Sequence, residues 1–279
     1  MTITIIGTGL IGGSLAIALK EKKLAERIIG VERDPAHAKT ALELGLVDEI
    51  NVIEEAIPKS DVIIIAVPVS VANNMIVSLL DQTDRQIVID AGSTKMAICK
   101  SADKSKNRKR FVATHPMWGT EFSGPSAAVR GAFAGNAVVI CDKDNSDAEA
   151  LNFTENMYRA LGMNIIYMDS EGHDVHAAYV SHISHITSFA LANTVLEKER
   201  EEDTIFGMAS GGFESTVRLA KSNHEMWVPI FQQNRENVLD VLNEHISQLR
   251  KFKSCLEKEN YEYLAKLIQN SNKIKRILK

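Results

Sequence analysis

Apolar positions divide the chain into two parts with different periodicities. In residues 1–168, short apolar runs recur with almost no polar alternation, which is typical of strands buried on both faces of a parallel sheet. The expected strands are Thr2–Ile6, Arg27–Val31, Val62–Val67, Gln86–Asp90, Arg110–Thr114, Ala137–Cys141 and Asn164–Met168. Helical spacing separates several of these runs, at Leu10–Glu21, Pro35–Leu44, Val71–Leu80 and Asp147–Leu161. The alternation predicts an α/β domain with a doubly wound parallel sheet over residues 1–168.

The strand signals stop after this point, and the pattern predicts an all-helical domain over residues 169–279. The expected helices are Gly172–Glu199, Phe213–Ser222, Glu225–Glu257 and Tyr261–Ile277. In Glu225–Glu257, apolar residues repeat mostly every three or four positions, which gives the helix one apolar stripe. Such a stripe packs either against the rest of the chain or against a second subunit.

The turn after the first expected strand has the pattern GxGxxG, written out as Gly7-Thr8-Gly9-Leu10-Ile11-Gly12. Between a strand and a helix, the first glycine permits a tight turn and the second lets the backbone approach a pyrophosphate. The third allows the helix to pack closely on the strand. The N-terminus of the following helix offers free N–H groups to phosphates. We therefore expect a Rossmann-type domain that binds a dinucleotide.

Glu32 follows the second expected strand, where this fingerprint places an acid that binds the ribose hydroxyls. Its carboxylate would repel the 2′-phosphate of NADP, so the sequence favours NAD as the cofactor. Arg33, the next residue, leaves some use of NADP open. In the alternative interpretation, Glu32 is an exposed side chain at a strand end.

Three more expected strands end in candidate site residues. Ligands of such sheets lie beyond the carboxyl ends of the strands, where Val67-Pro68, Ser93 and His115 are found. Because His115 precedes a proline, its backbone is biased toward an extended conformation. A neutral imidazole there would accept a proton from a substrate hydroxyl while hydride leaves the same carbon. In the alternative interpretations, His115 is a structural histidine at a strand end, and Val67-Pro68 is a plain strand-to-helix turn.

The helical part contributes a second group of polar side chains. His182 and His185 are three residues apart, so they face the same side of a helix. They either bind a carboxylate substrate or lie as ordinary polar residues at a domain boundary. We expect no metal site, because a catalytic zinc usually has a third protein ligand, and His173 and His176 are expected on other faces of the helix. Arg218 is either a carboxylate clamp or a surface ion-pair partner.

Composition excludes several classes of protein. The three cysteines lie far apart and form no CxxC pair, which favours a reducing cytoplasm over a disulfide framework or a zinc site. A net charge of −4 argues against a general nucleic-acid binder. No apolar run approaches the ~18 residues of a membrane-spanning helix, and the N-terminus lacks the basic start of a secretory signal. We expect a cytoplasmic protein with a small-molecule substrate and no nucleic-acid or membrane partner.

The motifs, taken in order, resemble those of the prephenate/arogenate dehydrogenase family of tyrosine biosynthesis. After GxGxxG come DxGSxK at Asp90–Lys95, HPxxGxE at His115–Glu121 and HDxxxAxxSHxxH at His173–His185. A last motif combines Gly211-Gly212-Phe213 with Arg218 and Trp227. The resemblance covers roughly residues 1–250, and other NAD-dependent folds share only the first motif.

The resemblance implies an NAD-dependent oxidative decarboxylation of prephenate to 4-hydroxyphenylpyruvate, with arogenate as the alternative substrate. Hydride leaves the ring carbon that bears the hydroxyl, carbon dioxide is lost, and the ring becomes aromatic. His115 would accept the hydrogen bond of that hydroxyl, Ser93 would bind the hydroxyl or the cofactor, and Arg218 would clamp a carboxylate. The other implied substrate-binding residues are Thr120, Glu121, Ser181, His182, His185, Gly211 and Trp227. The family also dimerises through its helical half, so the resemblance implies a homodimer.

Some positions depart from the family pattern, and two rival readings remain. Trp118, Ser184 and Thr94 stand where the family usually has Ala, Pro and Val, and Trp118 leaves the choice between prephenate and arogenate open. A β-hydroxyacid dehydrogenase or imine reductase would have a catalytic Lys or Asp on the helix Gly172–Glu199, whose only lysine, Lys198, is near its far end. An NAD-sensing regulator would need a basic helix-turn-helix, which the helical half does not contain.

Overall fold

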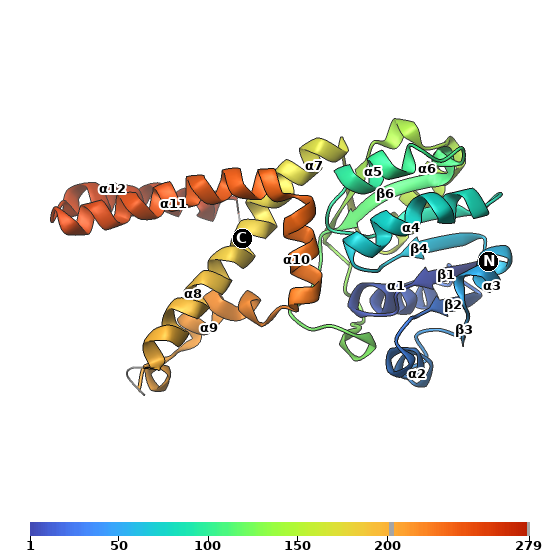
Figure 1. Cartoon of the computed structure of the whole chain (residues 1–279), viewed down its shortest axis with the longest axis horizontal. Coiled ribbons are helices and arrows are strands. Elements are labelled where there is room, and N and C mark those ends of the chain that lie inside the picture. Colours follow the sequence, from blue (N-terminus) through green and yellow to red (C-terminus); the bar gives the residue numbers. More distant parts are fainter. Residues whose placement is uncertain (201–203, 278–279) are drawn as a thin grey trace. The chain divides into compact units, whose positions relative to one another are not determined.

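A computed structural model describes residues 1–200 and 204–277 of the chain (Figure 1). The contacts divide the chain into two compact units, Met1–Asn234 and Arg235–Lys279. The first unit contains the whole sheet together with the helices that follow it up to Asn234. The domain boundary that we expected after residue 168 stays a prediction.

The first unit is built on one eight-stranded sheet with the order β3-β2-β1-β4-β5-β6-β7-β8. Its strands are β1 (Thr2–Ile6), β2 (Arg27–Val31), β3 (Glu49–Ile50), β4 (Val62–Ile65), β5 (Ile87–Asp90), β6 (Phe111–Pro116), β7 (Ala137–Cys141) and β8 (Asn164–Met168). The neighbouring strands pair in parallel, except that β7 runs antiparallel to β6. The predicted doubly wound α/β fold is confirmed. The sequence pattern missed β3, which is only two residues long, and the reversal at β7.

Helices cover both faces of this sheet (Figure 1). They are α1 (Leu10–Glu21), α2 (Pro35–Glu43), α3 (Ile53–Ala56), α4 (Val69–Gln82), α5 (Met96–Ala102) and α6 (Ala148–Ala160). Successive residues of β4 pack in two different hydrophobic clusters. Val62 and Ile64 pack in the cluster that includes α1 and α6, whereas Ile63 and Ile65 pack with α4 and α5. This two-sided burial explains why the strands are apolar at successive positions.

The remaining helices of the first unit are α7 (Ser170–Ala177), α8 (Ile183–Glu199), α9 (Gly211–Val217) and α10 (His224–Gln233). A π-helical turn, Ala178–His182, joins α7 to α8 within the segment that we expected to be one regular helix. The expected single helix Glu225–Glu257 is wrong, because it is interrupted at Asn234. This residue leaves the helical conformation (φ −107°, ψ 26°). Its buried side chain donates instead to the carbonyl oxygen of Asp174 at 2.7 Å.

The second unit consists of α11 (Arg235–Glu257) and α12 (Tyr261–Ser271), which pack together. The chain reverses at Glu259, whose φ is +52°, and the Asn260 side chain caps α12 by accepting from the Tyr263 N–H at 3.0 Å. The last expected helix, Tyr261–Ile277, is shorter in the structure. It ends at Ser271, and a 3₁₀ segment follows it. Among the described helices, none combines the length and apolar character needed to cross a membrane.

Candidate active site

The glycine-rich turn between β1 and α1 has the shape of a dinucleotide loop. Gly7 has φ +89°, and a Cβ on it would lie 2.6 Å from the carbonyl oxygen of Ala66. A Cβ on Gly12 would lie 1.9 Å from the Gly7 carbonyl oxygen, so this close approach of helix and strand requires glycine. A Cβ on Gly9 would meet nothing nearer than 4.0 Å. The space above Gly9 is therefore open at the N-terminus of α1, where a pyrophosphate binds in this class of fold.

Glu32 is held beside this loop by three donors. Its Oε2 accepts from the backbone N–H and the hydroxyl of Thr8, both at 3.0 Å, and its Oε1 accepts from the Asp34 N–H at 3.2 Å. The carboxylate is thus held at the end of β2 by donors of the chain itself. This position suits hydrogen bonds from ribose hydroxyls.

A cleft of about 290 Å³ joins most of the residues that the sequence assigned to the cofactor. Those that line it are Gly7, Gly9, Leu10, Ile11, Glu32, Val67, Pro68 and Ser93. Thr8 contributes through its bonds to Glu32, and Gly12 is buried inside α1. Met226 and Ile230 of α10 also line the cleft, and Ile230 packs with Val69 at the start of α4. The residues and their spacing fit a bound dinucleotide.

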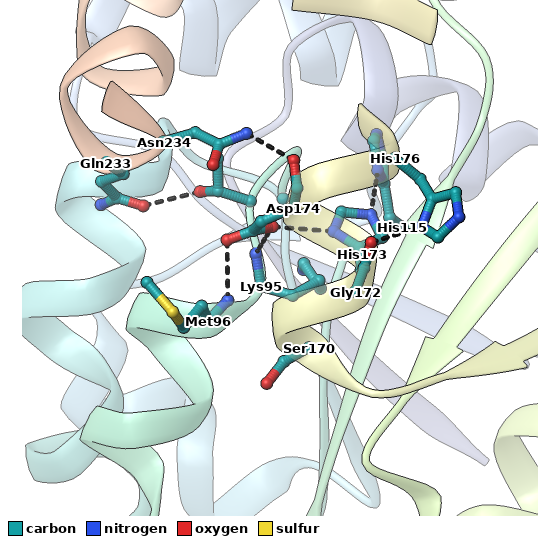
Figure 2. A network of polar contacts seen from close by, with 12 residues as sticks. Lys95, Met96, His115, Ser170, Gly172, His173, Asp174, His176, Gln233 and Asn234 are labelled. Carbon is teal, nitrogen blue, oxygen red and sulfur yellow. Dashed lines mark hydrogen bonds and ion pairs between the residues drawn. The ribbon is translucent and has the colours of Figure 1, made fainter. Parts of the chain in front are cut away.

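His115 lies near the end of β6 and is the first member of a short chain of polar contacts (Figure 2). Its Nδ1 is 2.8 Å from His173 Nε2, and His173 Nδ1 is 2.8 Å from Asp174 Oδ1. We expected His173 on another face of the helix from His182 and His185, but its ring contacts His115. On a regular helix of about 100° per residue, His173 and His182 would lie on opposite sides. The π turn adds one residue, and the Asn234 side chain contacts both His182 and the backbone of Asp174, the residue next to His173.

Asp174 is anchored by the segment that carries the DxGSxK motif. Its Oδ1 accepts from the Lys95 N–H at 2.8 Å and its Oδ2 from the Met96 N–H at 3.0 Å. The Lys95 ammonium is fully buried, pairs with Asp90 at the end of β5, and donates to the Thr114 carbonyl oxygen of β6 at 2.7 Å. These bonds join β5, β6 and α7, and one of them is made by Thr114, the residue before His115.

The surroundings of His115 keep its imidazole neutral. Burial of the ring holds its pKa well below the ordinary value, and the neighbouring His173 and Lys95 lower it further. A charged imidazolium cannot accept a proton, whereas a neutral ring has one free acceptor nitrogen. His115 is therefore in the form that a proton acceptor needs at neutral pH.

The histidines of the SHxxH motif lie in an apolar wall beside Trp227. His182 is buried, its Nδ1 is 3.1 Å from the Asn234 amide nitrogen, and burial lowers its pKa to about 4. His185 stacks on Trp227 with ring centroids 3.5 Å apart, and donates to the Ser181 carbonyl oxygen at 3.2 Å. His182 Nε2 and Trp227 Nε1 are buried with no hydrogen-bond partner among the described residues. Buried donors of this kind suit polar atoms of a substrate.

Arg218 and Glu121 meet although they come from distant parts of the sequence. Arg218 Nη1 donates to Glu121 Oε2 at 2.8 Å. The pKa of Glu121 is lowered by its own backbone N–H and by Arg218. Thr120 accepts a long hydrogen bond from the Phe122 N–H, 3.3 Å, in the same loop, and Gly211 is exposed at the start of α9. The guanidinium is thus within reach of solvent and already oriented by one carboxylate.

Six basic residues lie between Lys100 and Arg110, and two of them form ion pairs with the same part of the fold. Arg108 is paired with Asp103 at 2.7 Å, and Arg110 with Glu149 at 2.8 Å.

Over residues 1–200 and 204–277, no group of three or more His, Cys, Asp or Glu side chains is arranged to hold a metal ion.

The fold and the glycine-rich cleft define an NAD-dependent dehydrogenase. The chain belongs to the prephenate dehydrogenase family. Residues 15–167 match the family model described as "Prephenate dehydrogenase, nucleotide-binding domain", and residues 169–270 match "Prephenate dehydrogenase, dimerization domain".

Individual relatives agree with this assignment. The chain is 30% identical to a prephenate dehydrogenase of Bacillus subtilis over 267 residues, which cover 94% of this chain and 72% of the relative. It is 27% identical to a cyclohexadienyl dehydrogenase of Zymomonas mobilis, covering 99% of this chain and 96% of that one. The crystal structure of prephenate dehydrogenase from Aquifex aeolicus with hydroxyphenyl propionate and NAD⁺ superposes with a TM-score of 0.89. It is 29% identical and covers 99% of this chain and 97% of that chain.

Four residues of the site were missed by the sequence interpretation: Lys95, His173, Asp174 and Asn234. Lys95 and the His173-Asp174 pair stand in motifs that the sequence displays, so their presence was visible. Their contacts were not, because Lys95 and Asp174 are 79 positions apart and only the tertiary structure brings them together. Asn234 carries no motif signal.

Proposed function

We propose that this chain oxidises prephenate to 4-hydroxyphenylpyruvate with NAD⁺ and releases carbon dioxide. The observation that supports this most is His115, a neutral histidine in a chain of this family. It lies where the carboxyl ends of the strands meet, and the same edge of the sheet borders the dinucleotide cleft. The ribose-binding position is occupied by Glu32, which favours NAD over NADP.

His115 Nε2 would accept the proton of the ring hydroxyl as hydride leaves the carbon that carries it. The bond between the ring and its carboxylate then breaks, and the bond's electrons complete the aromatic ring. Bound NAD⁺ supplies the hydride acceptor. The new phenolate takes a proton back, so the reaction releases no net proton. Because the ring becomes aromatic, the residues mainly need to orient the substrate and hold one proton.

The remaining roles follow from position. Ser93 borders the cleft and would bind the hydroxyl or the cofactor. Arg218 would exchange its contact with Glu121 for a carboxylate of the substrate, forming charge-assisted hydrogen bonds. His182, His185 and Trp227 would line the ring and side-chain pocket.

Arogenate, which carries an ammonium group in place of the keto group, is the alternative substrate. Trp118, the departure that left this choice open, packs edge-on against Phe133, with ring centroids 5.6 Å apart. Its bulk is therefore directed partly into the core of the first unit. This placement favours neither substrate.

The test is the rate of NADH or NADPH formation with prephenate or arogenate, each with NAD⁺ or NADP⁺. We expect the highest kcat/KM with prephenate and NAD⁺. A higher value with arogenate would keep the chemistry and change the substrate. Absence of turnover in all four mixtures, with folded protein that binds NAD⁺, would overturn the proposal.

We also propose a cytoplasmic homodimer that assembles through the second unit. Its helices leave Leu249, Leu256, Tyr261 and Ile268 about half exposed or more, at 55%, 59%, 60% and 49%. Light scattering should give about twice the chain mass of 30.8 kDa, and Leu249→Glu should shift it toward the monomer. A monomeric wild-type protein would contradict the homodimer.

A further inference from the structure

We propose that Asp174 and His173 are positioning residues that hold His115 in one tautomer. In this tautomer His115 is protonated on Nδ1, and Nε2 presents its lone pair to the substrate hydroxyl. The proposal rests on the proposed function for its consequence in catalysis. The tautomer itself is a property of the folded chain and is measurable without substrate.

Asp174, the far end of the chain of contacts that leads to His115, is 1% exposed. Two backbone N–H groups, those of Lys95 and Met96, donate to its two oxygens. Its own backbone carbonyl accepts from the Asn234 side chain at 2.7 Å. Asp174 is thus fixed both at its side chain and at its backbone, and its carboxylate is surrounded by donors. A carboxylate in such surroundings acts only as an acceptor.

The tautomer of His173 follows from this acceptor. His173 Nδ1 is 2.8 Å from Asp174 Oδ1, so Nδ1 must carry the hydrogen. In the proposed arrangement His173 is neutral, and a neutral imidazole protonated on Nδ1 has its lone pair on Nε2. His173 is 2% exposed, and its Nε2 points at His115 (Figure 2).

The tautomer of His115 follows in turn. His173 Nε2 accepts, so the donor across the 2.8 Å contact is the Nδ1–H of His115. The opposite assignment would place two lone pairs against each other at that distance, in a buried site where an unmade hydrogen bond is costly. The lone pair of His115 is therefore on Nε2, the nitrogen that does not contact His173.

The arrangement also supports the proton transfer. When Nε2 takes the hydroxyl proton, His115 becomes a cation that still donates from Nδ1 to His173. The carboxylate charge of Asp174 lies one ring away and stabilises that cation. The other charged or titratable groups around His115 are Lys95 at the start of α5, paired with Asp90, and His182 in the π turn. A triad of Asp, His and nucleophile uses a carboxylate in the same way, to fix a tautomer without taking the proton.

Two substitutions at His173 separate positioning from packing. His173→Leu removes the acceptor and should lower kcat about 100-fold or more, with little change in the KM for prephenate or in NAD⁺ affinity. His173→Gln keeps an acceptor oxygen and should recover most of that loss. His176→Leu, an exposed histidine on the same helix, is the matched control and should retain wild-type kcat.

The direct readout is the ¹⁵N NMR spectrum of the full chain labelled with ¹⁵N-histidine, with His115→Asn used to assign the His115 signals. We expect a protonated Nδ1 and an unprotonated Nε2 in the wild type, and a mixture of tautomers in His173→Leu. A wild-type His115 protonated on Nε2 would overturn the proposal, and so would wild-type kcat in His173→Leu. If the proposed reaction itself is wrong, the wild type is inactive with prephenate while the NMR result stands.

Discussion

At the scale of single residues, Glu32 shows how local sequence places a functional group. It follows β2 directly, and Thr8 within the glycine-rich loop fixes one of its oxygens. The strand end and the glycine-rich motif were visible in the sequence, because each depends on neighbouring residues, but the contact between Thr8 and Glu32, 24 positions apart, was not. The contacts that link Asp174 to His115 through His173 were not visible, because His115 and His173 are 58 positions apart in the sequence and only the tertiary structure brings them together.

Replacing Glu32 with serine should relax the preference for NAD. The variant loses the carboxylate that binds ribose hydroxyls and repels a 2′-phosphate. We expect the ratio of kcat/KM with NAD⁺ to kcat/KM with NADP⁺ to fall by about 10-fold or more, corresponding to about 1.4 kcal/mol. Glu55→Ser, at an exposed position of α3, is the control. An unchanged ratio would show that Glu32 does not reach the ribose.

Replacing Arg218 with alanine should weaken substrate binding more than it slows turnover. A charge-assisted contact of about 1.5–3 kcal/mol corresponds to a rise of roughly 10- to 100-fold in the KM for prephenate. Steady-state kinetics at saturating NAD⁺ measures both parameters, and Lys221→Ala, nearby and exposed, serves as the control. A loss confined to kcat would argue against a carboxylate clamp.

At the scale of elements, the periodicity located most strands and helices but not the interruptions within them. The bounds of β1, β2, β7 and β8 agree with the apolar runs. For β1, β2 and β7 the burial of successive residues explains the continuous signal, whereas β8 is a partly exposed edge strand. The π turn at Ala178–His182 and the break at Asn234 left none. At Asn234 the decisive interaction is a hydrogen bond to Asp174, distant in sequence, and no local propensity reports it.

The contact between β1 and α1 yields a prediction for Gly12→Ala. Its methyl group would overlap the Gly7 carbonyl oxygen, so α1 must move away from the strand. Overpacking of this kind costs about 1–3 kcal/mol. Urea unfolding should show that loss, and NAD⁺ binding should weaken because the loop moves with the helix. Gly207→Ala, where a methyl group meets nothing within 4 Å, should leave both quantities unchanged. Wild-type NAD⁺ affinity in Gly12→Ala would contradict the close packing.

At the scale of the whole molecule, buried neutral histidines predict a loss of stability in acid. The pKa of His182 is about 4 in the folded chain, against an ordinary value of about 6.5 when unfolded. Between these values the unfolded chain binds a proton that the folded chain does not, so the free energy of unfolding falls as pH falls. One such group accounts for about 2 kcal/mol between pH 7 and pH 5.

Urea unfolding at pH 7 and pH 5 measures this difference. In His182→Phe the loss between the two pH values should shrink by roughly that amount, whereas His224→Gln, an exposed histidine, should behave as the wild type. An equal loss in His182→Phe would mean that His182 does not remain neutral in the folded chain.

If His115 accepts the substrate proton while a separate loop binds NAD⁺, one substitution should separate the two functions. The decisive experiment measures kcat for prephenate oxidation by His115→Asn, with NAD⁺ affinity determined on the same preparation. We expect kcat to fall by ~10²–10⁴-fold and the affinity for NAD⁺ to stay unchanged. A variant that turns over prephenate at the wild-type rate would show that His115 is not the proton acceptor.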